Sequence, residues 1–124
     1  MLRAIILTGI GGGVGSILRY LTAVLLGKYL QTLFPLAIFT ANVVGSFLIG
    51  LLLGLSERQQ WSSPDLKFLF ITGFCGGYTT FSTFSADNLI LCQSGHCLTA
   101  FLHIAASVLT GMAAVWLGWT LTKI

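Results

Sequence analysis

Four long apolar runs make up most of this chain, at residues 4–26, 34–55, 66–92 and 98–121. Each is long enough to cross the hydrocarbon core of a bilayer, which takes roughly 20 residues of α-helix. Only 7% of the 124 residues are charged, whereas about one quarter are charged in an ordinary soluble domain. The sequence therefore predicts an all-α, multi-pass membrane protein in which residues 1–124 form one domain with four transmembrane helices.

The third run contains an unusual segment, residues 73–85 (GFCGGYTTFSTFS), in which paired glycines precede five hydroxyl side chains. In hydrocarbon, backbone polar groups need partners, so a helix break is tolerated only where it is buried in protein or lines a polar cavity. We therefore expect a broken third helix, with two half-helices whose ends line a path for an ion or another substrate.

Several polar side chains within the apolar runs could donate hydrogen bonds to a transported species. His103, Ser107 and Thr110 lie on one face of the fourth run, at positions i, i+4 and i+7. The other candidates are Asn42, Ser82, Thr83, Ser85 and Arg19. A path that is rich in donors and poor in carboxylates favours an anion. The alternative is that these side chains only join neighbouring helices.

Phe81 and Phe84 lie three residues apart, beside the hydroxyl groups of the third run. Phenylalanine usually serves packing, but the edge of its ring carries partial positive charge. Ring edges combined with carboxamide and hydroxyl donors suit a small, strongly hydrated anion, and fluoride fits that description. The two rings are therefore candidates for the path.

Several classes of function find no support in the sequence. It has no Ser/His/Asp arrangement, carboxylate pair or metal-ligand cluster, so we expect that the protein is not an enzyme. Its six basic residues are spread along the chain, without the polybasic tract that would predict nucleic-acid binding. The glycines of the first run, Gly9, Gly11, Gly13 and Gly15 among them, favour close helix packing. They do not complete a G-x-G-x-x-G phosphate loop.

Three segments, in this order, resemble the CrcB/Fluc family of fluoride channels: residues 11–20 (GGGVGSILRY), 40–50 (TANVVGSFLIG) and 73–85. The resemblance covers nearly the whole chain. It implies a passive, fluoride-selective channel that exports fluoride across the bacterial inner (plasma) membrane and lowers cytoplasmic fluoride. It also implies an antiparallel, dual-topology homodimer surrounded by membrane lipid, with one structural Na⁺ at the dimer centre and no nucleic-acid partner.

The resemblance further implies roles for individual residues. The backbone carbonyl groups of Gly76 and Thr79 would bind the Na⁺. Asp87 stands where the family has glutamate, and with Arg19 it would form part of a vestibule or a structural pair. On the fourth span, His103 and Ser107 match the polar track of the family, and the next track position, usually a hydroxyl residue, is Gly111 here, with Thr110 adjacent. The fluoride pathway as a whole would consist of Asn42, Phe81, Ser82, Thr83, Phe84, His103 and Ser107.

The main alternative is a small multidrug-type proton-coupled antiporter, which also has four spans and a similar length. Such a protein should carry a glutamate within its first span. Residues 4–26 contain none, and Arg19 has the opposite charge. A second alternative, a structural subunit whose glycines only pack helices, would not explain the glycine and hydroxyl segment.

Overall fold

The computed structural model describes residues 1–29, 34–59 and 64–123, and every regular element in these ranges is a helix. The long helices are α1 (Leu2–Tyr29), α2 (Leu36–Gln59) and α6 (Cys97–Leu121). Between α2 and α6 the chain forms the short α3 (Pro64–Leu66), the π-helical η1 (Lys67–Cys75), the short α4 (Gly76–Tyr78) and α5 (Ser82–Gln93). The predicted all-helical architecture is confirmed for these residues.

Among the described residues, three helices are long and apolar enough to cross a membrane: α1, the first 22 residues of α2, and α6. Their apolar side chains mostly face outward, and only 11% of the most apolar part of α1 is buried. A helix with so much exposed apolar surface is stable against lipid rather than water. The protein is therefore a multi-pass membrane protein. The third apolar run is divided among the four shorter helical elements.

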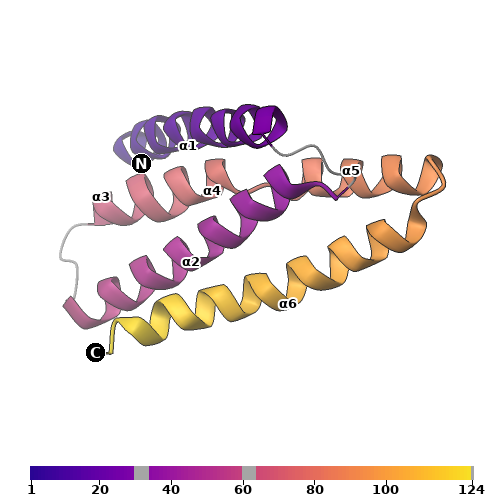
Figure 1. Ribbon diagram of the computed structural model, residues 1–124. Helices are drawn as coiled ribbons and strands as arrows, with labels where there is room; N and C mark the ends of the chain where they lie inside the picture. The colour runs from indigo at the N-terminus through magenta and orange to yellow at the C-terminus, as the bar shows by residue number, and fades with distance from the viewer. Residues whose placement is uncertain (30–33, 60–63, 124) are drawn as a thin grey trace.

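The long helices α2 and α6 pack on each other, and the segment from η1 to α5 connects them to α1. Helix α2 packs along α6, and α1 packs on η1 and α4, while α5 extends beyond α4 and packs on α6. In Figure 1, α3, α4 and α5 follow one another in a row, and both chain termini lie at the same end of the bundle. This arrangement brings the segment between α4 and α5 next to α2 and α6.

Glycines allow α1 to approach η1 and α4 closely. A Cβ atom added at Gly11 would lie 2.9 Å from the backbone nitrogen of Phe74, and one at Gly15 would lie 2.8 Å from that of Tyr78. Both positions are buried. A Cβ atom added at either glycine of the other pair, Gly9 and Gly13, would meet nothing within 4 Å. The predicted close packing is thus confirmed within the chain for Gly11 and Gly15, and for Gly9 and Gly13 it stays a prediction.

The helical run is interrupted between Tyr78 and Ser82. On each side of the break, a threonine hydroxyl group forms a hydrogen bond with a backbone group. Thr79 is extended, with φ −88° and ψ 158°, and its hydroxyl group donates to the carbonyl of Cys75 at 2.8 Å. The hydroxyl oxygen of Thr80 accepts a hydrogen bond from the backbone N–H of Thr83 at 3.3 Å. This bond satisfies one of the N–H groups that the start of a helix leaves without a partner.

Candidate functional site

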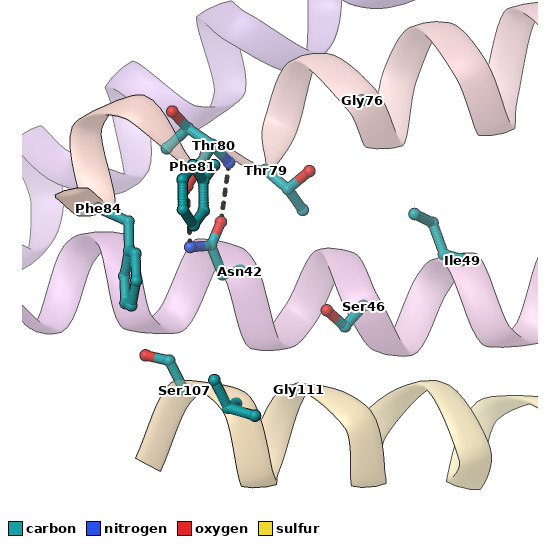
Figure 2. A pocket seen from close by; sticks show the side chains of 11 residues that line it. Asn42, Ser46, Ile49, Gly76, Thr79, Thr80, Phe81, Phe84, Ser107 and Gly111 are labelled. Carbon is teal, nitrogen blue, oxygen red and sulfur yellow. Dashed lines mark hydrogen bonds between the residues drawn. The ribbon is translucent and has the colours of Figure 1, made fainter. Parts of the chain in front are cut away.

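An open cavity of about 450 Å³ lies where the interruption faces α2 and α6 (Figure 2). Its lining comes from three separate parts of the sequence, and none of the lining side chains is charged. The lining residues are Asn42, Ser46, Ile49, Gly76, Thr79, Thr80, Phe81, Phe84, Ser107, Val108 and Gly111. The fold therefore brings together six of the residues expected from the sequence to form the sodium site or the fluoride pathway.

The carboxamide of Asn42 holds the interrupted segment against α2. Its Oδ1 accepts a hydrogen bond from the backbone N–H of Thr80 at 2.9 Å, and its Nδ2 donates to the carbonyl of the same residue at 3.1 Å. Figure 2 shows both bonds as dashed lines. The hydrogen-bond partner of this asparagine is therefore the backbone of the interrupted segment.

The two phenylalanine rings form one side of the cavity. Their centroids are 5.9 Å apart and their planes are inclined at 36°. The Phe84 ring is half-buried and packs on His103, with 4.8 Å between the ring centroids. The Phe81 side chain is 78% exposed. In a single chain, therefore, most of the Phe81 ring surface is available to an ion or to another protein surface.

The polar side chains expected on α6 differ in their surroundings. Ser107 lines the cavity, and its buried hydroxyl group has no hydrogen-bond partner among the described residues. His103, one turn earlier, is fully buried beneath Phe84 and is not part of the cavity lining. Its Nδ1 lies 3.0 Å from Oδ1 of Asn88 on α5. Gly111 lines the cavity one turn beyond Ser107.

The interruption also leaves backbone carbonyl groups available. In a continuing α-helix the N–H of Thr80 would bond the carbonyl of Gly76, four residues earlier. It bonds Asn42 instead. Gly76 and Thr79 both line the cavity, and a Cβ at Gly76 would meet nothing within 4 Å. Carbonyl oxygens of this kind are ligands that a hard cation prefers.

Six other residues expected to be functional lie outside the cavity lining, and two of them, Ser85 on α5 and Thr110 on α6, are exposed. Ser82 and Thr83 are exposed in the first turn of α5. Arg19 on α1 and Asp87 on α5 are each partly buried. Within residues 1–29, 34–59 and 64–123, no ion pair joins these two side chains; Arg3 instead pairs with Asp65 at 2.9 Å. The roles expected for Arg19 and Asp87 stay predictions.

The structure adds Thr80 and Asn88, which the sequence analysis did not single out. Thr80 supplies the backbone groups that Asn42 bonds. Asn88 follows Phe84 by four residues, so helical periodicity places both on one face of α5. That spacing is the signal by which Asn88 could have been found.

Fold and cavity together define a small multi-pass membrane protein with an uncharged, donor-bearing cavity at a helix interruption. Within that class, residues 6–119 match the family described as CrcB-like protein, Camphor Resistance (CrcB). The chain belongs to this family, and the resemblance that was noted in its sequence is confirmed.

Individual relatives are similar over their whole length. The chain is 51% identical over 122 residues to a protein of Flavobacterium psychrophilum named fluoride-specific ion channel FluC, with 98% of each chain covered. A protein of the same name from Azobacteroides pseudotrichonymphae is 46% identical over 99% of this chain and 98% of its own length. Another, from Ignicoccus hospitalis, is 42% identical over 98% of this chain and 97% of its own.

Proposed function

We propose that this protein is a fluoride-selective channel through which fluoride leaves the cell passively. The observation that carries the proposal is the combination, in one uncharged cavity, of two phenylalanine rings, the Asn42 carboxamide and the unpartnered Ser107 hydroxyl. Ring edges and neutral donors can replace the hydration shell of a small anion. The relatives named as fluoride-specific ion channels support the same conclusion.

The proposed channel is not an enzyme, and the family match sets aside the alternative of a multidrug antiporter. Passive flow is sufficient for export. Hydrogen fluoride is a neutral weak acid that crosses lipid and dissociates inside the cell, where the anion is trapped. A negative interior then drives the anion outward by about 2.3 kcal/mol per elementary charge per 100 mV. In bacteria the location would be the inner (plasma) membrane.

Two copies of the chain would close the pathway. The cavity is open on one side and the Phe81 ring is 78% exposed, so a lone chain would leave a passing anion facing lipid. We assign the missing wall to a second copy, in an antiparallel dual-topology homodimer with two pathways. In each copy, η1, α4 and α5 would together form one broken membrane span, which completes a single four-span domain.

A sodium ion at the dimer centre fits the carbonyl groups of Gly76 and Thr79. The break frees the Gly76 carbonyl from its helical partner, and both residues line the cavity. Two oxygens from one chain are too few for a hard cation, so equivalent carbonyls of a second copy would complete the ligand set. The ion would join the two subunits and add a positive charge near the anion pathway.

Fluoride efflux from liposomes tests the proposed function. Purified protein is reconstituted into vesicles loaded with equal concentrations of potassium fluoride and potassium chloride, valinomycin lets K⁺ leave to balance the charge, and each anion is followed with an ion-selective electrode. We expect rapid fluoride efflux and no chloride efflux above that of protein-free vesicles. Equal efflux of both anions would contradict the selectivity, and efflux of neither would contradict the channel.

A further inference from the structure

Three buried polar atoms without a hydrogen-bond partner are found in the described part of the chain, and all three lie on α5 or α6. They are Nδ2 of Asn88, Nε2 of His103 and Oγ of Ser107. Asn88 is only 8% exposed, and His103 is completely buried. Leaving such groups unpaired costs free energy. Their position on two helices that pack together therefore points to a polar ligand beside this part of α5 and α6.

The contact between Asn88 and His103 decides which of these atoms can donate. Oδ1 of Asn88 lies 3.0 Å from Nδ1 of His103. A carboxamide oxygen only accepts hydrogen bonds, so the proton between these atoms belongs to Nδ1. In a neutral imidazole the other nitrogen, Nε2, then carries a lone pair and cannot donate to an anion. Nδ2 of Asn88, in contrast, has two N–H bonds and no hydrogen-bond partner in the part of the chain that the structure describes.

The ring of Phe84 separates this pair from the cavity. Phe84 lines the cavity, and its ring centroid lies 4.8 Å from that of His103. Phe34 and Phe39 cover other sides of the imidazole, with centroids at 5.0 Å and 6.3 Å. An anion that passes Phe84 would therefore leave its hydration behind and enter an aromatic enclosure, where an N–H donor is needed.

We propose that Asn88 is a further anion donor of the pathway, one step beyond Phe84, and that His103 is a positioning residue. This inference rests on the fluoride channel proposed above. The imidazole donates from Nδ1 to hold the carboxamide oxygen, and this bond turns Nδ2 toward the anion. Ser107, one turn along α6 and at the cavity wall, supplies the hydroxyl group that precedes Asn88 along the path.

The protonated nitrogen of His103 can be observed without measuring transport. The chain has two histidines, so the variant His96→Gln leaves His103 as the sole reporter. In protein labelled with ¹⁵N at histidine, we expect NMR to show a neutral ring protonated at Nδ1. The variant Asn88→Leu should lose this preference. A ring protonated at Nε2, or at both nitrogens, while Asn88 is present overturns the assignment.

Fluoride efflux tests the donor role. Because a hydrogen bond to an ion is lost, Asn88→Leu should reduce fluoride efflux roughly tenfold or more. The matched control is Gln93→Leu, which removes an exposed amide from the same helix and should leave efflux unchanged. Asn88→Ala serves if the leucine variant does not fold. Normal efflux in a folded Asn88 variant overturns the proposal.

A double-mutant cycle separates donation by His103 from positioning. If the imidazole acts through Asn88, His103→Phe should lower efflux in the unmodified protein but add little in the Asn88→Leu background. An equal loss in both backgrounds would show that His103 acts directly. If the unmodified protein passes no fluoride at all, the proposed function and the donor role both fail, whereas the NMR result still decides the Nδ1 assignment.

Discussion

The Asn42 side chain bonds both backbone polar groups of Thr80, accepting from its N–H at 2.9 Å and donating to its carbonyl at 3.1 Å. The carboxamide therefore replaces a turn of helical hydrogen bonding at the point where the chain departs from the helix. A carboxamide has two N–H bonds, and the contact with Thr80 uses one of them. The second remains for a ligand in the cavity that Asn42 lines.

Replacing Asn42 by aspartate should abolish this double contact and place a carboxylate in the cavity. The carboxylate cannot donate to the Thr80 carbonyl, and it repels an anion a few ångströms away by several kcal/mol. We expect Asn42→Asp to lower fluoride efflux at least about a hundredfold, since each 1.4 kcal/mol is a factor of ten. Efflux from liposomes checks this, and wild-type efflux would contradict a pathway role. Asn42→Leu, which removes the contact without adding charge, shows how much of the loss is structural.

Replacing Phe81 by isoleucine tests the ring that is most exposed in a single chain. Because the side chain is 78% exposed, its loss should cost the isolated fold little, while the pathway loses a ring edge worth roughly tenfold in flux. Fluoride efflux and the unfolding temperature in detergent are measured together. Phe101→Ile, which alters a 67% exposed ring outside the cavity lining, is the control. Equal efflux in both variants would remove Phe81 from the pathway.

The helical architecture and the position of the interruption could be predicted from the sequence because both follow from local patterns. Apolar runs of sufficient length predict the spans, and the paired glycines before Thr79 mark where the helical run is interrupted. The partners within the site could not be predicted in this way. That Asn42 bonds Thr80, 38 residues away, depends on how α2 packs against the interruption, which no local pattern encodes.

The burial of His103 illustrates the same limit. Periodicity places it on a polar stripe with Ser107, which suggests a side chain that faces the path. Packing instead covers it with the rings of Phe34 and Phe39, near the start of α2, and of Phe84 on α5, so the rings come from two distant parts of the chain. A helical stripe predicts the direction of a side chain but not which neighbouring residues cover it.

The proposed dimer predicts that a large side chain at Gly76 weakens dimerisation without unfolding the single chain. A Cβ there meets nothing within 4 Å in one chain, so Gly76→Leu should leave the monomer folded. In the dimer the same side chain would crowd the proposed sodium site and raise the dimer dissociation constant at least about tenfold, given 1–3 kcal/mol for overpacking. Light scattering on detergent-solubilised protein gives the dimer fraction. Gly13→Leu, at an equally open glycine on α1, is the control, and an intact dimer in the Gly76 variant would argue against this placement.

A final prediction concerns the support that α1 gives to the interruption. Gly15 packs on the backbone of Tyr78, the last residue of α4. A Cβ atom added at Gly15 would lie 2.8 Å from the Tyr78 nitrogen. Gly15→Ala should therefore destabilise the fold by about 1–3 kcal/mol. Gly13→Ala, two residues away and without a neighbour within 4 Å, should be neutral or slightly stabilising, since alanine favours helix by up to about 1 kcal/mol.

Both glycine variants can be compared by thermal unfolding in the same detergent, with fluoride efflux measured in parallel. Pushing α1 away from Tyr78 would also shift Thr79 and Thr80, which follow it directly and line the cavity. We therefore expect Gly15→Ala to lose efflux as well as stability, and Gly13→Ala to keep both. If Gly15→Ala were as stable as the control, the close contact between α1 and α4 would not exist in the membrane.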